Sequence, residues 1–150
     1  ISNEPGFLTP TLYNYVGRPD KTAEVVRKTL KERYNTTKEG IPGNDDSGSM
    51  SSWYVFHALG FYPNTGQDLY LISSPTFEEA VIHLENGRDL SIKAKKASDK
   101  NIYVQSVKLN GEPLDACSFK HTDIANGGTL EFVMGSKPSK WGTVGVENQL

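Results

Sequence analysis

Hydrophobic residues recur at helical spacing in the first part of the chain and at alternate positions in the rest. Ala23, Val26, Leu30 and Tyr34 follow one another at steps of three and four residues, and charged residues fill the opposite side. This spacing predicts an amphipathic helix that Asp20 can cap and that ends near Tyr34–Asn35.

Two further segments of helical character flank this helix. Apolar residues between Leu8 and Val16 share the same spacing, which predicts a helix before the amphipathic one. A mostly apolar run at 50–59 is closed by Gly60, a residue type that favours the left-handed position after a helix. We expect a short helix there, and its apolar circumference predicts burial on several sides.

After Pro63 the pattern changes to short alternating runs separated by turn residues. Asn86-Gly87 and Asn110-Gly111 are signatures of tight hairpins, because both central positions of such a turn take positive φ. The sequence therefore predicts an α+β fold, with a helical segment over 1–63 and an antiparallel β-sheet or sandwich unit over 64–150. Strands are expected at 69–73, 80–84, 90–96, 102–109 and 129–134, with a weaker one at 116–120.

Composition narrows the class of protein. The chain has 150 residues, 36% of them hydrophobic and 23% charged, which is typical of a soluble globular domain. A net charge of −2 gives no basic footprint for nucleic acid. No run approaches the roughly 18 apolar residues that a membrane span needs. One cysteine excludes an internal disulfide, and an Ile rather than Met at position 1 leads us to expect a piece of a longer protein.

The most distinctive polar stretch is Gly43-Asn44-Asp45-Asp46-Ser47-Gly48. Adjacent carboxylates repel one another unless a cation or a hydroxyl network compensates them. Oxygen donors of this kind suit Ca²⁺, and a carboxylate can also act as general base on a water. The alternative is purely structural, with Asp46 or Ser47 capping the next helix.

Other polar positions have simpler interpretations. Asn3-Glu4-Pro5 precedes a helical segment, so Asn3 or Glu4 can serve as its cap. His57 lies among apolar neighbours, which is typical of a core histidine. Asn35-Thr36-Thr37 matches the N-glycosylation acceptor sequence, which bears on function only in a protein secreted through a glycosylating pathway.

Several motifs follow one another in order along nearly the whole chain. Those in the helical segment are Asn3-Glu4-Pro5, Tyr13-Asn14-Tyr15, Gly17-Arg18-Pro19, Gly43 to Tyr54 and Gly60-Phe61-Tyr62-Pro63. Those beyond it are Tyr70 to Pro75, Ile102 to Ser106, Leu109-Asn110-Gly111, His121 to Ile124, Gly127-Gly128 and Met134-Gly135. In this combination the chain resembles the α-mannosidases of glycoside hydrolase family 92.

The resemblance implies a fold, an activity and a set of site residues. Members of that family are exo-acting, Ca²⁺-dependent, inverting α-mannosidases with an N-terminal β-sandwich and a C-terminal (α/α)₆ catalytic domain. This chain resembles their C-terminal end, so its helices would belong to the barrel. The resemblance makes Asp46 the general base and Asp45 a calcium ligand. It places Asn44, Asn3 and Glu4 in contact with substrate, with Asn3 also a possible metal ligand.

The resemblance also implies what the chain lacks. The general acid of the family is a glutamate in an upstream motif that is absent here, so we expect the fragment alone to be inactive. Asp45 and Asp46 cannot form the acid–base pair, because inverting enzymes separate those groups by roughly 6.5–9.5 Å. The implied partners are a mannose-containing glycan and the rest of the catalytic domain, in a secreted or periplasmic protein.

A non-catalytic β-rich module that binds glycan or docks on a neighbouring domain is the alternative function. The environment of Asp45 and Asp46 discriminates between the two. If both side chains only cap the helix and face solvent, with no shared site, the enzymatic interpretation has no chemical support.

Overall fold

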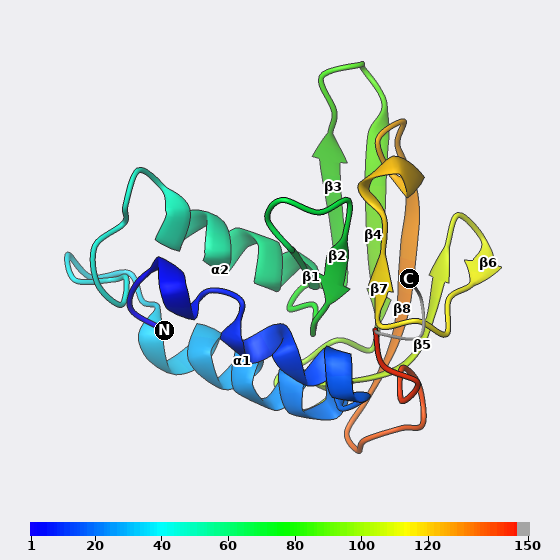
Figure 1. Ribbon diagram of the computed structural model, residues 1–150, viewed down its shortest axis with the longest axis horizontal. Coiled ribbons are helices and arrows are strands. Elements are labelled where there is room, and N and C mark those ends of the chain that lie inside the picture. Colours follow the sequence, from blue (N-terminus) through cyan, green and yellow to red (C-terminus); the bar gives the residue numbers. More distant parts are fainter. Residues whose placement is uncertain (147–150) are drawn as a thin grey trace.

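The computed structural model describes residues 1–146, with helices on one side of the molecule and strands on the other (Figure 1). Two 3₁₀ helices come first, and α1 and α2 then lead into the strands. The fold is mixed α+β, as predicted, while the division of the chain at residue 63 stays a prediction. The helical elements are η1 (Glu4–Gly6), η2 (Thr9–Val16), α1 (Pro19–Arg33), α2 (Ser49–Leu59) and η3 (His121–Asp123).

The amphipathic helix α1 forms where its spacing predicts it, but its cap is different. The helix begins at Pro19, whose fixed φ suits the first position, and Arg18 occupies the N-cap. Asp20 therefore lies inside the first turn and makes no capping bond. Its carboxylate instead accepts two hydrogen bonds from the Arg18 guanidinium, at 2.8 and 2.7 Å.

The apolar helix α2 ends at Gly60, as predicted. Gly60 has a φ of 101°, and its N–H donates to the carbonyls of the last turn. The expected burial on several sides is found for much of the helix, because Phe56 packs against both hydrophobic clusters, but Val55 is 54% exposed. The fully buried residues of α2 are Met50, Trp53, His57 and Ala58. No helix within residues 1–146 is long and apolar enough to cross a bilayer.

The strands form two sheets. A small antiparallel sheet has the order β1-β2-β7, and a larger sheet has the order β3-β4-β8-β5-β6. All six predicted strands are present, and β1 and β6 are short additional ones. The strands are β1 (Phe61–Pro63), β2 (Tyr70–Ile72), β3 (Glu79–His83), β4 (Asp89–Lys95), β5 (Tyr103–Leu109), β6 (Glu112–Pro113), β7 (Ser118–Phe119) and β8 (Gly128–Gly135).

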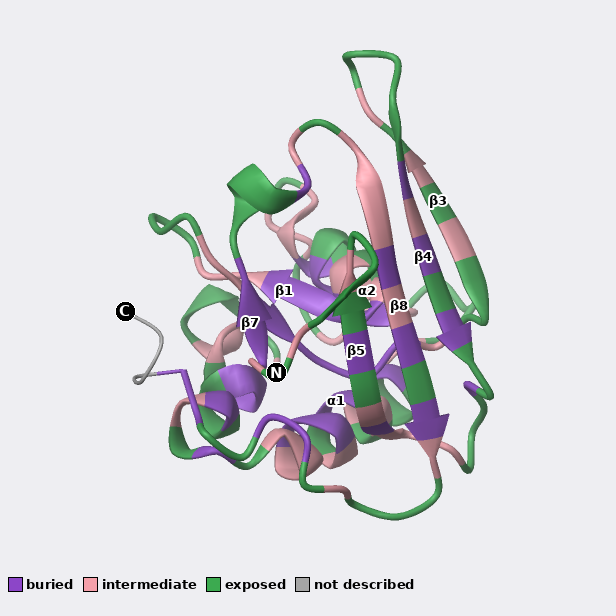
Figure 2. Cartoon of the chain, turned by 90° about the vertical axis from the view of Figure 1, so that its right-hand side faces the viewer, coloured by how far each residue is buried: buried purple, intermediate pink, exposed green. Residues whose placement is uncertain are grey.

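The prediction of a wholly antiparallel β unit is wrong at one pair of strands. β8 returns between β4 and β5, and it runs parallel to β4 and antiparallel to β5. Both strands bury alternate residues, visible as the repeating buried bands in Figure 2. An alternating pattern identifies the buried face of a strand but is the same in either direction, so it carries no information on this pairing.

Asn14 of η2 connects the helical part to the small sheet. Its side chain is fully buried, and its Nδ2 donates to the carbonyl oxygens of Ile72 (2.7 Å) and Cys117 (3.1 Å). Its Oδ1 accepts a hydrogen bond from the hydroxyl of Thr22 on α1, at 2.7 Å. One carboxamide thus joins η2, α1, β2 and the segment leading into β7. All of its partners are buried or belong to the backbone.

We expect Asn14→Leu to lower the free energy of unfolding by about 3 kcal/mol, because it removes three buried hydrogen bonds, those to the Ile72 and Cys117 carbonyls and from the Thr22 hydroxyl. Urea unfolding of the purified chain measures this loss. The matched control Asn126→Leu changes an exposed asparagine and should alter stability by less than about 0.5 kcal/mol. Equal stability of the two variants would contradict the role assigned to Asn14.

Candidate active site

The N-terminal segment carrying Asn3 and Glu4 is held against α2. It turns through the 3₁₀ helix η1, where Phe7 N–H donates to the Glu4 carbonyl at 3.0 Å. The indole N–H of Trp53 donates to the Phe7 carbonyl at 3.0 Å. Asn3 stands at the N-cap of η1 without a side-chain capping bond, so the predicted capping role is wrong for Asn3. The two polar side chains are exposed and available for other contacts.

The loop before α2 has an unusual backbone. Asp46 and Ser47 have φ values of 50° and 59°, in the left-handed region that non-glycine residues rarely adopt, and Gly48 follows at 91°. The turn is closed by Ser49, whose N–H and hydroxyl both donate to the Asp46 carbonyl, at 3.2 and 2.7 Å. Strained backbone of this kind is concentrated at functional sites.

The loop and the N-terminal segment touch at Gly43. A Cβ atom added to Gly43 would overlap the carbonyl oxygen of Ser2, and the φ of Gly43 is 121°. Only glycine therefore allows the two backbones to approach this closely. Figure 1 shows the N-terminus beside the loop between α1 and α2. The contact brings together two polar motifs that lie far apart in the sequence.

Asp45 caps α2. Its Oδ1 accepts hydrogen bonds from the N–H and the hydroxyl of Ser51, at 2.9 and 2.8 Å. A carboxylate at this position satisfies a free N–H of the first turn and interacts favourably with the helix dipole. The predicted alternative, capping by Asp46 or Ser47, is wrong, because the N-cap is Gly48 and neither side chain bonds to the helix N-terminus.

Asp46 faces the N-terminal segment instead. Its carboxyl group lies beside that of Glu4, close enough for the two groups to interact electrostatically. Partial burial raises the pKa of Asp46, and the neighbouring charges of Glu4 and Asp45 raise it further. Among residues 1–146, the ion pairs that form lie elsewhere, so no Lys or Arg of the described chain neutralises this cluster.

The five predicted site residues therefore divide into two groups. Glu4 and Asp46 are in contact, and Asp45 lies beside them while it caps the helix. Asn44 is exposed, and its Oδ1 lies 3.4 Å from the Asp46 amide nitrogen, a weak bond within its own loop. Asn3 adjoins Glu4 without a side-chain contact to the described residues that places it in the cluster.

The cluster offers oxygen donors but few of them. Within the described part of the chain, no group of three or more His, Cys, Asp or Glu side chains is arranged to hold a metal ion. Ca²⁺ takes six to eight oxygen ligands, and carboxylate and carboxamide oxygens are the kinds that it prefers. The residues present thus fit calcium in chemistry and supply only part of a full ligand set.

Two residues beside the cluster were missed in the sequence. Ser51 holds Asp45 through two hydrogen bonds, and its place after the loop was the available signal. Burial raises the pKa of the Tyr34 phenol, and the nearby Tyr62 and Asp45 raise it further. The hydroxyl of Tyr34 donates to the Met50 carbonyl at 3.1 Å and its ring stacks on Trp53. The helical spacing that ends at Tyr34 gave no sign that this residue lies near Asp45.

Comparisons of the sequence and of the fold with known proteins agree with one another. The model of the glycosyl hydrolase family 92 catalytic domain matches residues 1–136. An uncharacterized secreted glycosidase of Arthroderma benhamiae is 41% identical over 146 residues, which cover 95% of this chain and 19% of that protein.

Two solved structures are similar throughout the chain. A family GH92 α-mannosidase of Bacteroides thetaiotaomicron, in complex with mannoimidazole, has a TM-score of 0.89 and 36% identity over 93% of this chain and 18% of its own. A family GH92 inverting mannosidase of the same organism has a TM-score of 0.86 and 34% identity, covering 94% of this chain and 19% of its own.

The chain thus spans less than a fifth of the length of these relatives. The match nevertheless includes both motifs that meet at the acidic cluster, because it runs from residue 1 to residue 136. The sequence match and the shared fold agree, and this chain belongs to glycosyl hydrolase family 92.

Proposed function

We propose that this chain is the C-terminal part of the catalytic domain of a secreted, exo-acting α-mannosidase that hydrolyses α-mannosides of glycans with inversion. Its helices would belong to an (α/α)₆ barrel completed by the rest of the protein. Family membership supports the reaction class, and the similarity to an inverting mannosidase supports the stereochemistry. The secreted relative supports the location.

One observation carries the proposal. The carboxyl group of Asp46 meets that of Glu4, because Gly43 lets the loop pass directly against Ser2. A turn that merely caps a helix has no need of this contact, and the cap is already supplied by Asp45. The environment therefore supports an enzymatic role over a non-catalytic β-rich module.

In the proposed reaction, Asp46 is the general base. It takes a proton from a water molecule whose oxygen forms a bond to the anomeric carbon of the mannoside. The bond from that carbon to the glycosidic oxygen breaks, and a general acid outside this chain protonates the leaving oxygen. A raised pKa suits a general base, because the best proton acceptors titrate near the working pH.

Calcium would be held by Asn3 and Asp45 together with ligands from elsewhere in the protein. When bound, the ion would contribute a positive charge that holds sugar hydroxyls and favours distortion of the ring. Oδ2 of Asp45 accepts no hydrogen bond from residues 1–146 and is available for such a role, because both bonds from Ser51 go to Oδ1. Asn44 and Glu4 would contact the sugar or the attacking water.

We expect Asp46→Asn in the full-length protein to lower kcat for an aryl α-mannoside by about 10²–10⁴-fold, because the carboxamide cannot accept the proton. Circular dichroism should show an unchanged fold. The control Asp115→Asn alters an exposed carboxylate in the segment between β6 and β7 and should keep full activity. Turnover by Asp46→Asn near the wild-type rate would contradict the assignment of the base.

We expect Glu4→Gln to move the acidic limb of the kcat/KM profile of the full-length protein to lower pH. The raised pKa of Asp46 delays its ionisation, and removing the neighbouring negative charge relieves part of that effect. The pH dependence is the diagnostic measurement, since a loss of substrate binding alone lowers kcat/KM without moving the limb. An unmoved limb would show that Glu4 does not influence the base. Glu112→Gln, in the exposed strand β6, is the control.

We expect the isolated chain to show little or no mannoside turnover and no micromolar affinity for Ca²⁺ by calorimetry. The proposed acid lies outside it, and general acid catalysis is typically worth about 10²–10⁴-fold. The described residues also supply few of the ligands that calcium needs. Micromolar calcium binding by the chain alone would show that its own residues complete the site.

A further inference from the structure

The segment that follows α1 contains a motif that the proposed mechanism does not use. Asn35-Thr36-Thr37 has the form Asn-X-Thr, the acceptor sequence for N-linked glycans. Every other asparagine of the chain lacks Ser or Thr two positions later. The sequence therefore contains one such motif, and the structure around Asn35 determines whether a glycan can be attached to it.

The local geometry leaves the reactive nitrogen of Asn35 available. Asn35 Oδ1 accepts hydrogen bonds from the N–H and the hydroxyl of Thr37, at 2.9 and 2.6 Å. The backbone N–H of Asn35 donates to the Gly40 carbonyl at 3.0 Å, which closes the loop. The oxygen of the carboxamide is thus engaged, while Nδ2 makes no hydrogen bond to the described residues. The short bond from the Thr37 hydroxyl polarises the carboxamide that would react.

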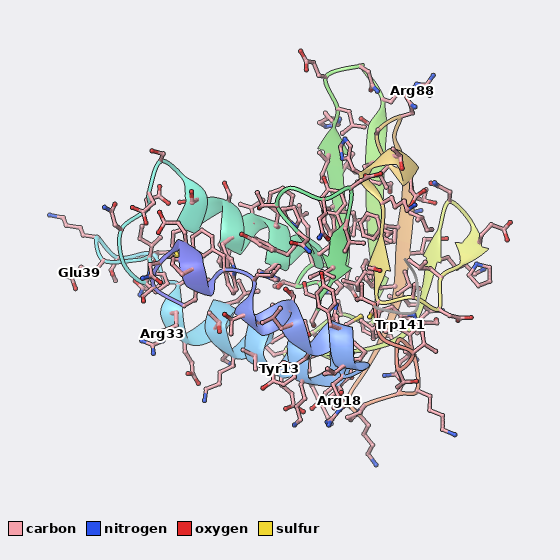
Figure 3. All side chains as sticks on the ribbon, in the orientation of Figure 1. Tyr13, Arg18, Arg33, Glu39, Arg88 and Trp141 are labelled. Carbon is pink, nitrogen blue, oxygen red and sulfur yellow. The ribbon has the colours of Figure 1, made fainter. Side chains whose placement is uncertain are left out.

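The loop also provides room for a sugar. Residues 35–39 are all exposed, and Figure 3 shows Arg33 and Glu39 at the end of the molecule away from the strands. Asn35 borders a groove of about 520 Å³ whose floor is largely apolar. The apolar side chains that line it belong to Tyr34, Ile41, Tyr54 and Val55. Among residues 1–146, the first sugar of a glycan can therefore leave Nδ2 without meeting packed side chains, and its C–H face can lie against the groove.

We propose that Asn35 is an N-glycosylation site. Nδ2 attacks the anomeric carbon of an oligosaccharide linked through diphosphate to a lipid. The new carbon–nitrogen bond forms as the bond from that carbon to the diphosphate oxygen breaks. The lipid diphosphate leaves, and the carboxamide gives one proton to a base of the transferase. This inference rests on the proposed secretion of the protein, because the transfer takes place on proteins that enter a secretory pathway.

The test uses the full-length protein secreted by its own source. Treatment with peptide-N-glycosidase in H₂¹⁸O converts a glycosylated asparagine to ¹⁸O-labelled aspartate, which mass spectrometry locates in the peptide. We expect the label at position 35 in most molecules and a fall in apparent mass on a gel. An unlabelled Asn35 in the secreted protein would overturn the site and leave secretion intact. Absence of the protein from the medium would overturn secretion, and this site with it.

Four variants secreted from the same source separate the motif from the fold. Asn35→Gln and Thr37→Ala should each lose the glycan completely, and Thr37→Ser should keep it, because serine retains the hydroxyl that the acceptor sequence requires. Asn126→Gln, a change at an exposed asparagine outside any such motif, should carry the same glycan as the parent. A glycan retained in Thr37→Ala would overturn the proposal.

Discussion

The carboxamide of Asn14 is the contact on which the arrangement of helices and strands depends. It makes hydrogen bonds to Thr22 of α1, to Ile72 of β2 and to Cys117, and all three partners are buried. The thiol of Cys117 donates back to the Asn14 carbonyl at 3.4 Å. Burying a polar group without a hydrogen-bond partner is costly. All of these hydrogen bonds form together only when η2, α1 and β2 are placed as they are in this structure. The helical part is thereby fixed in position and orientation against the small sheet.

That placement determines where the acidic cluster forms. α1 and α2 meet through Val26, Leu30 and Trp53, and the Trp53 indole holds the N-terminal segment through the Phe7 carbonyl. The loop between the helices is then brought to the same end as the N-terminus, and Gly43 passes against it. The cluster is thus a product of helix packing, which is why its two halves can lie far apart in the sequence.

Much of this organisation was predictable from the sequence, for identifiable reasons. α1, the end of α2 and the six strands follow from hydrophobic spacing and from glycine at turn positions, which are local properties. The parallel pairing of β4 with β8, the cap of α1 and the exposure of Val55 depend on what lies opposite each element, and spacing does not encode that. The sequence was enough to single out Asp45 and Asp46 as candidate residues of the cluster. The contact of Asp46 with Glu4 needed the three-dimensional structure.

The two adjacent aspartates illustrate why position in the fold decides chemistry. Asp45 points to the N-terminus of α2, where two hydrogen bonds and the helix dipole stabilise its negative charge. Asp46 takes a left-handed backbone conformation and turns toward Glu4, where a second carboxyl group disfavours its charge. Groups whose environments differ in this way are suited to different roles. The left-handed turn at 46–48 therefore gives two chemically identical neighbours different surroundings, one at the start of a helix and one beside a second carboxyl group.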